Sequence, residues 1–367
     1  RWSLLLPLLL AACAPAGRVG PVPAPQSPML TADASRCAAL RGAGADRLVV
    51  DTAEWIPAGQ VRAREPGSNR EVGEPLPAHC LLRGRLDERV GTDGERYHTG
   101  FELRLPAQAN GRLLYQGGGG NDGVLNMAVG RNTGALGWAD NALLRGFAAV
   151  STDAGHQSPA PLFGLDPQAR VEHAWRAHWR TATTARQLHQ RLYGALPHHS
   201  YFIGCSGGGR QGMMFTQRFP ELFDGVIAQA PAMRVAQGAT VAAAWTVQRF
   251  LDVAPTGPDG RKVLAQAFSD AQLQRVAREV LDRCDAADGL ADGLVSDTAL
   301  CRVNPQRLVC PAGGEGCLSA EQARALAAMM AGPVNRDGGR LYVGWPWDPG
   351  LAAPGWRQWT LGSSTTG

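Results

Sequence analysis

One serine of this chain lies in a sequence context that favours nucleophilic chemistry. Ser206 is the central residue of Gly204-Cys205-Ser206-Gly207-Gly208, which fits the pattern G-x-S-x-G. In that pattern the serine adopts a strained backbone conformation between a strand and a helix, and glycine neighbours avoid steric clashes. The hydroxyl is left exposed, and the N–H of Gly207 at the start of the helix can stabilise a developing oxyanion. The pattern therefore predicts a nucleophile for acyl transfer.

The segments around Ser206 predict the elements that must position it. Residues 201–203 are aromatic or β-branched, which is typical of a buried strand, and a helix is expected directly after the serine. Residues 112–116 and 147–153 predict two further core strands, and residues 224–230 predict another. Between them, residues 171–192 carry apolar side chains at helical spacing. This order predicts parallel strands joined by right-handed crossovers.

Upstream, the sequence predicts more strand and one unusual loop. Residues 97–105 alternate apolar and polar side chains, and residues 37–100 predict a peripheral β region that leads into the sheet. The strand at 112–116 ends in four glycines, 117–120, followed by Asn-Asp-Gly. A glycine run after a strand can bind phosphate, but neither a following Gly-Lys-Ser/Thr nor a spaced G-x-G-x-x-G is present. The run is therefore either part of an oxyanion site or a surface loop.

The residues that follow Ser206 resemble a known family. Cys205-Ser206 precedes Gly-Gly-Arg-Gln-Gly, and residues 217–228 read Gln-Arg-Phe-Pro-Glu-Leu-Phe-Asp-Gly-Val-Ile-Ala. Together they resemble the tannase and feruloyl esterase family, and the likeness runs from about Cys37 to the last residue. The resemblance implies an α/β-hydrolase fold, with the N-terminal part of the hydrolase domain at 37–231 and an inserted lid domain at 232–367. It also implies hydrolysis of esters of aromatic acids, such as galloyl, feruloyl or terephthalate esters.

The same resemblance implies roles for individual residues. Gly120 would supply the second oxyanion N–H beside that of Gly207. Gly207 stands where many feruloyl esterases have threonine, which leaves the backbone donor intact. Trp359 would pack against an aromatic substrate, whereas Trp345, Trp347 and Trp356 are interpreted as lid core. Three disulfides are implied, namely Cys37 with Cys80, Cys284 with Cys301, and Cys310 with Cys317.

The base and the orienting carboxylate of a catalytic triad are not found where the fold would put them. In the α/β-hydrolase order both follow the nucleophile, yet all eight histidines lie at or before His199. His156 is interpreted as structural, and the histidines at 173, 178 and 189 as surface or packing residues. Cys205 lacks the His-Cys partner that the family pairs with it. The expectation is a C-terminally truncated chain, inactive alone, whose triad histidine and aspartate lie beyond its end. The alternative is a non-catalytic, lipid-anchored and calcium-stabilised hydrolase remnant or binding protein.

An acidic, glycine-rich loop at residues 284–294 predicts a cation site. Carboxylates this close would repel one another unless a hard cation were bound, and oxygen ligands suit calcium. The spacing differs from that of an EF-hand. By resemblance, calcium would be held by three side chains and two backbone carbonyls, those of Asp285, Asp288, Asp292, Leu290 and Leu294. The alternative is a solvated acidic turn.

The N-terminus predicts export. A charged start, a short leucine-rich run and Ala-Ala before Cys13 are typical of a signal peptide, and the segment is too short to span a bilayer. Cys13 is either the lipidated residue of a bacterial lipobox, giving an outer-membrane lipoprotein, or an incidental cysteine in an ordinary signal. Residues 14–36 predict a flexible linker. A net charge of only +4 over 367 residues, without a dense basic run, argues against a nucleic-acid partner.

Overall fold

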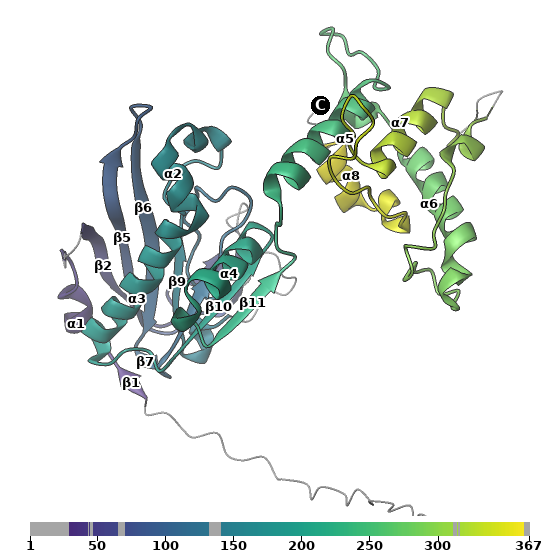
Figure 1. Ribbon diagram of the computed structural model, residues 1–367. Helices are drawn as coiled ribbons and strands as arrows, with labels where there is room; N and C mark the ends of the chain where they lie inside the picture. The colour runs from purple at the N-terminus through teal and green to yellow at the C-terminus, as the bar shows by residue number, and fades with distance from the viewer. Residues whose placement is uncertain are drawn as a thin grey trace, which may run out of the picture. The chain divides into compact units, whose positions relative to one another are not determined.

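The computed structural model describes residues 29–42, 44, 47–64, 70–131, 141–310, 314 and 316–362. The predicted signal peptide, Cys13 and most of the linker therefore lie outside the described residues. The chain divides into two compact units, Arg1–Ala232 and Met233–Gly367 (Figure 1).

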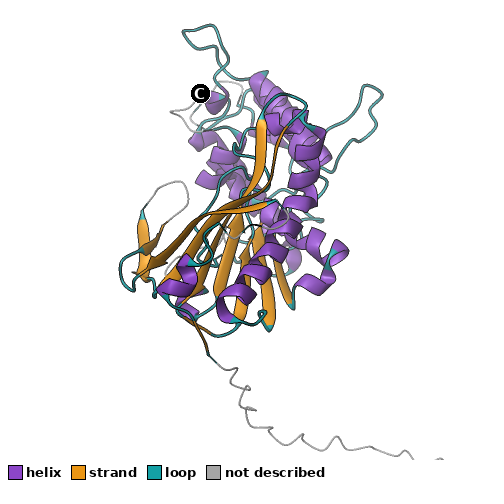
Figure 2. Ribbon diagram, turned by 90° about the vertical axis from the view of Figure 1, so that its left-hand side faces the viewer, coloured by secondary structure: helices purple, strands orange, loops and turns teal. Residues whose placement is uncertain are grey.

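The first unit is built on a seven-stranded sheet, in the order β11-β10-β8-β9-β6-β5-β2 (Figure 2). Neighbours from β11 to β9 are parallel, and those from β9 to β2 are antiparallel. The five strands from β6 to β11 that belong to this sheet lie at the predicted positions, and β2 and β5 lie within the predicted β region. Their bounds are β2 Leu48–Ile56, β5 His79–Val90, β6 Arg96–Pro106, β8 Arg112–Gln116, β9 Ala148–Thr152, β10 His199–Cys205 and β11 Gly225–Gln229.

The β region expected at the periphery is in fact a continuation of this sheet. β5 pairs with β6 and β2 pairs with β5, each in antiparallel register. Their inward side chains, such as Leu82 and Leu86, join the same core as the parallel strands, which explains why the two parts are one sheet. Only short pairs stand apart, β1 Leu30–Thr31 with β7 Gln108–Ala109 and β3 Arg62–Arg64 with β4 Glu71–Pro75.

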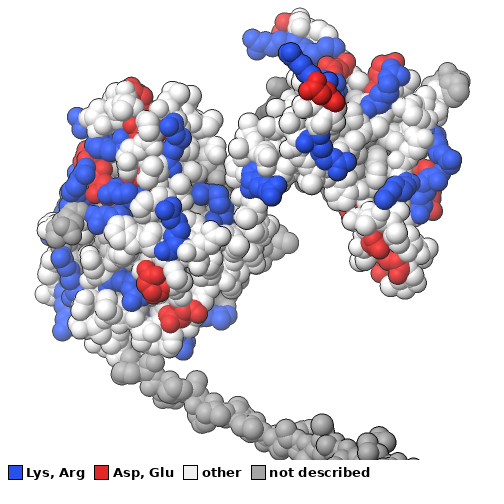
Figure 3. All heavy atoms as spheres, viewed as in Figure 1, with Lys and Arg blue, Asp and Glu red and all other residues white. Residues whose placement is uncertain are grey.

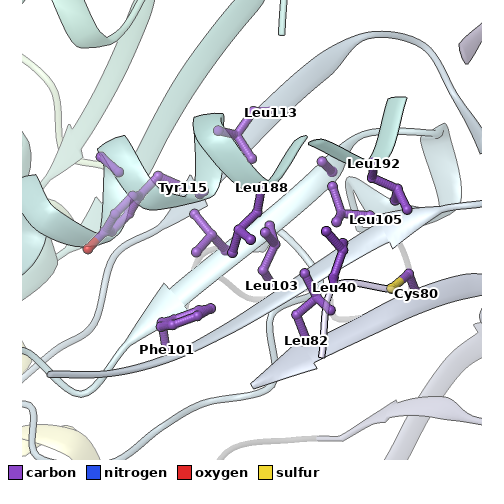
Figure 4. Close-up of a cluster of buried hydrophobic side chains, with 14 of the residues drawn as sticks. Leu40, Cys80, Leu82, Phe101, Leu103, Leu105, Leu113, Tyr115, Leu188 and Leu192 are labelled. Atoms are coloured by element: carbon purple, nitrogen blue, oxygen red, sulfur yellow. The ribbon is translucent and has the colours of Figure 1, made fainter. Parts of the chain in front are cut away.

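Helices cover one face of the sheet and enclose the main core. The predicted helix from 171 comprises α2 Pro167–Val171, a π-helical turn Glu172–Arg176 and α3 Ala177–Tyr193. α4, Gly207–Arg218, follows Ser206, and α1, Ala34–Ala38, is tied to β5 by the Cys37–Cys80 disulfide. Leu188 of α3 packs with Leu103 and Tyr115 of the sheet in the buried cluster shown in Figure 4.

The second unit is helical and has its own core. Its helices are α5 Ala243–Leu251, α6 Asp270–Cys284, α7 Ala320–Ala331 and α8 Pro354–Thr360, with a π-helical turn at Ala236–Ala242 before α5. Ser319 caps α7 through a capping box with Gln322, and α6 begins in the same way with Ser269 and Gln272. Phe250, Phe268 and Leu326 are fully buried in this core.

Charged side chains on the first unit are mixed with uncharged ones. On the face of the first unit seen in Figure 3, charged side chains are scattered among uncharged ones and do not form one basic patch. Within the part of the chain that the structure describes, no helix combines the length and the apolar character needed to cross a membrane.

Candidate active site

Ser206 sits at the turn between β10 and α4, in a strained backbone conformation. Its φ is 58° and its ψ is −114°, a region that non-glycine residues rarely adopt. The conformation is held on both sides, because the Ser206 N–H donates to the Gln229 carbonyl (3.0 Å) and the Ser206 carbonyl accepts from the N–H groups of Arg210 and Ala232 (3.0 Å each). The residue is exposed. A serine presented by so constrained a turn has the placement that a nucleophile requires.

Three glycines allow the backbone to pack tightly around this serine. A Cβ on Gly204 would lie 2.6 Å from the carbonyl carbon of Gly208, so the turn could not close with a larger residue. A Cβ on Gly207 would lie 2.7 Å from the Gly120 oxygen, and one on Gly208 would lie 2.5 Å from the Gly118 oxygen. The glycine run at 117–120 is therefore packed directly against the first turn of α4.

The hydrogen bonds of this glycine loop single out one N–H. The Gly117 N–H donates to the Ile203 carbonyl (2.8 Å), that of Gly118 to Gln211 Oε1 (3.2 Å), and that of Gly119 to Asp122 Oδ1 (3.1 Å). No acceptor for the Gly120 N–H is found among the described residues. Its φ of 57° is left-handed, which favours glycine. The Gly120 N–H, beside Gly207, is thus the donor of the loop that is available to a ligand.

Two buried side chains that the sequence analysis missed hold the loop in place. Gln211 of α4 is fully buried, and its Nε2 donates to Asp122 Oδ2 (2.8 Å) while its Oε1 binds Gly118. Asp122 in turn binds Gly119, so the pair clamps two consecutive glycines. Asp122 directly follows the glycine run and Gln211 lies in the first turns of α4, but no sequence signal shows that they meet.

Burial governs the ionisation of this clamp. Desolvation raises the pKa of Asp122 to about 7, against the opposing effects of Arg210 and of the hydrogen bonds from Gln211 and Gly119. His173 Nδ1 lies 3.6 Å from Asp122 Oδ2. Burial, reinforced by Arg210 and His156, lowers the pKa of His173 to about 3, so the ring is neutral and the contact is not an ion pair at neutral pH.

The other histidines near these elements have structural roles, as expected. His156 Nε2 donates to the Asn121 carbonyl (2.7 Å), and His189 Nδ1 donates to the Ala195 carbonyl (2.8 Å). His178 and His189 are fully buried in the helix that packs on the sheet. Burial lowers the pKa of all three rings. Within the described residues, no histidine forms a hydrogen bond with Ser206.

The cysteines pair as the resemblance implied. Disulfides join Cys37 with Cys80, Cys284 with Cys301, and Cys310 with Cys317. Cys205, beside the serine, is the one free cysteine in the described part of the chain.

The burial of the tryptophans at 345, 347, 356 and 359 agrees only in part with the prediction. Trp347 and Trp356 pack against its core, as predicted, and Trp359 on α8 is 91% exposed. The prediction that Trp345 belongs to the core is wrong, because its side chain is 55% exposed and only its backbone N–H is held, by the Met330 carbonyl.

The acidic loop is closed by its own backbone. Asp285 Oδ1 accepts from the N–H groups of Asp292 and Gly293 (3.1 and 3.0 Å), and Asp288 accepts from those of Leu290 and Ser296 (3.1 and 2.9 Å). The donor set is all oxygen, which suits a hard cation. Across the described residues, however, no three His, Cys, Asp or Glu side chains converge as metal ligands would. Leu290 and Leu294 are 62% exposed.

Comparison with known proteins gives a consistent match. The family described as tannase and feruloyl esterase matches residues 88–367. Mono(2-hydroxyethyl) terephthalate hydrolase of Piscinibacter sakaiensis is 37% identical over 90% of this chain and 59% of its own, and a probable feruloyl esterase B-1 of Aspergillus fumigatus is 33% identical over 66% and 43%.

Solved structures show the same fold. The crystal structure of feruloyl esterase B from Aspergillus oryzae superposes with a TM-score of 0.69 at 23% identity, covering 90% of this chain and 62% of that one. The predicted α/β-hydrolase class is therefore confirmed. The chain spans about three-fifths or less of the length of these relatives.

Proposed function

Because the chain belongs to the tannase and feruloyl esterase family, we propose that it provides the nucleophile and oxyanion site of a serine carboxylic ester hydrolase. The observation that carries the proposal is the contact of Gly120 with Gly207 next to the strained Ser206. Two N–H groups that converge beside a nucleophile stabilise the negative charge that forms on the carbonyl oxygen.

The chemistry follows from these parts. The Ser206 hydroxyl attacks the ester carbonyl, its proton passes to a base, and the N–H groups of Gly120 and Gly207 hold the oxyanion of the tetrahedral intermediate. Collapse of the tetrahedral intermediate releases the alcohol and leaves an acyl-serine. Water then hydrolyses the acyl-serine to the free acid and regenerates the Ser206 hydroxyl. In this proposal the base is a histidine oriented by an aspartate, and both lie outside residues 1–367.

We infer that the substrate is an ester of an aromatic acid. The relatives are named for terephthalate and feruloyl esters, and the terephthalate hydrolase matches with the higher identity and coverage. Trp359 is proposed to pack against the aromatic ring, since a nearly fully exposed indole offers a flat apolar face.

Two further proposals concern stability and location. We propose that calcium binds the loop of Asp285, Asp288 and Asp292 in a structural role. The Cys284–Cys301 disulfide beside it would share the task of holding a segment with little core. We also propose that the protein is exported, with Cys13 as the residue of a lipid anchor.

The enzymatic proposal has two parts, the nucleophile and the substrate class, and each is tested by its own assay. Protein from the complete gene should react with a fluorophosphonate at Ser206, identified by peptide mass spectrometry, and the Ser206→Ala variant should not. The wild-type protein should also hydrolyse monoesters of terephthalate, ferulate or gallate. Labelling without aromatic ester hydrolysis would refute the substrate class, and absence of labelling would favour a non-catalytic binding protein.

A further inference from the structure

The peptide group between Gly119 and Gly120 carries the N–H that the proposed function assigns to the oxyanion. Its carbonyl, that of Gly119, accepts from the Asp122 N–H (2.9 Å). Because a trans peptide group is planar, its C=O and N–H point in opposite directions, so fixing this carbonyl also fixes the direction of the Gly120 N–H. A Cβ on Gly207 would lie 3.1 Å from the Gly120 nitrogen, which places this peptide group against the first turn of α4.

Asp122 also holds the preceding peptide group of the loop. Its Oδ1 accepts from the Gly119 N–H (3.1 Å), so Asp122 binds Gly119 through its backbone and through its carboxylate. A Cβ on Gly118 would overlap Asp122 Oδ1, so the carboxylate can come this close only because residue 118 is a glycine. Asp122 thus determines the direction of the Gly120 N–H from both sides of Gly119.

Gln211 orients the carboxylate of Asp122 in turn. Its Nε2 donates to Asp122 Oδ2 (2.8 Å), and its Oε1 accepts from the Gly118 N–H (3.2 Å). Both side chains are buried, so water does not compete for these hydrogen bonds. The amide of Gln211 donates with one atom and accepts with the other, which joins the loop and the carboxylate into one hydrogen-bonded unit.

We propose that Gln211 is a positioning residue of the esterase site, which acts through Asp122 to aim the Gly120 N–H at the oxyanion. The inference rests on the proposed function and deepens it, because it assigns the alignment of one oxyanion donor to a buried side chain of α4. Loss of one such donor lowers turnover by a factor of about 10²–10³, so a misaligned donor should slow the reaction with Ser206 without unfolding the chain.

The polarity of this pair of side chains can be reversed. Gln211→Glu alone sets two buried carboxylates against each other, and Asp122→Asn alone sets two amide donors against each other. In the double variant with both substitutions, the carboxylate at 211 accepts from the Gly118 N–H and from the amide at 122. The oxygen of that amide still accepts from the Gly119 N–H. Both loop contacts are therefore kept, and only the hydrogen bond between the two side chains changes direction.

The measurement is the rate of fluorophosphonate labelling at Ser206, in protein from the complete gene. It is made at pH 8.5, where Asp122 is ionised, because burial raises its pKa to about 7. Each single variant should lower the maximal labelling rate about tenfold or more at an unchanged half-saturating concentration, and the double variant should return to within about threefold of the wild type. Gln217→Glu is the control, since it adds the same charge at an exposed position of α4 and should label as the wild type does.

Thermal melting verifies that each variant folds. Wild-type labelling rates in both single variants would overturn the role of Gln211, and so would a double variant that is unfolded or as slow as the single ones. If the single variants do not fold, the double variant alone decides: a rate near that of the wild type supports the inference. Absence of labelling in the wild type would instead refute the esterase proposal, so the two failures are distinguishable.

Discussion

Replacing Asp122 by asparagine tests whether the buried carboxyl group that holds the glycine loop makes the free energy of unfolding depend on pH. In the folded chain the pKa of Asp122 is raised from 3.8 to about 7 by burial. The folded state therefore keeps a proton that the unfolded state releases. The stability linked to this proton is fully present below about pH 4 and is lost as the pH rises through 7.

The magnitude follows from the size of the shift. Three pKa units correspond to about 4 kcal/mol at most, of which the folded protein loses nearly all above pH 8. Asp122→Asn removes this loss. It also places an amide group opposite Gln211 Nε2, where two donors face each other, at a cost of about 1–3 kcal/mol. Because about 1.6 kcal/mol of this loss has already occurred by pH 5, the variant should gain about 2–3 kcal/mol relative to the wild type between pH 5 and pH 8.5.

Hydrogen exchange of the β8 and β10 amides measures this difference within the first unit alone. Opening free energies of wild type and variant are compared from pH 5 to 8.5, after correction for intrinsic exchange rates. A constant difference for Asp122→Asn across this range would refute the reasoning.

Three other outcomes are expected. Gly208→Ala places a Cβ 2.5 Å from a carbonyl oxygen of the glycine loop, so it should lower the free energy of unfolding by about 1–3 kcal/mol and slow fluorophosphonate labelling. Gly164→Ala is the control, because its Cβ meets nothing within 4 Å and should change neither quantity. Removing the Cys37–Cys80 disulfide, which spans 43 residues, should lower the free energy of unfolding by about 4 kcal/mol in urea titrations. Calcium should raise the melting temperature of the wild type, and Asp288→Asn should abolish that rise; equal melting with calcium and with chelator would contradict the site.

Local sequence was sufficient for the parts of the fold that have local causes. The strand at 201–203 and the turn at Ser206 depend on residue types within a few positions, and both were predicted correctly. The capping box at Ser319 is likewise encoded within four residues. The disulfide partners came from a family resemblance, because spacing alone does not determine connectivity.

Features that depend on distant contacts were not predictable in this way. The continuation of the sheet through β5 and β2 is set by pairing across strands, and the alternation of side chains does not reveal which neighbour a strand has. The clamp of Asp122 and Gln211 joins residues 89 positions apart. The exposure of Trp345 depends on packing within the second unit, which composition cannot specify.

The same limitation hides a contact that adjoins the glycine loop. Gln116, the last residue of β8, precedes that loop, and its Oε1 accepts from the N–H groups of Gly130 and Arg131 (3.0 and 3.2 Å). Its Nε2 donates to the Met127 carbonyl (3.2 Å), so one buried side chain anchors the backbone of residues 127–131. The last residue of β8 thus precedes the glycine loop that packs against α4 and also holds residues 127–131, which are 11 to 15 positions further along the chain.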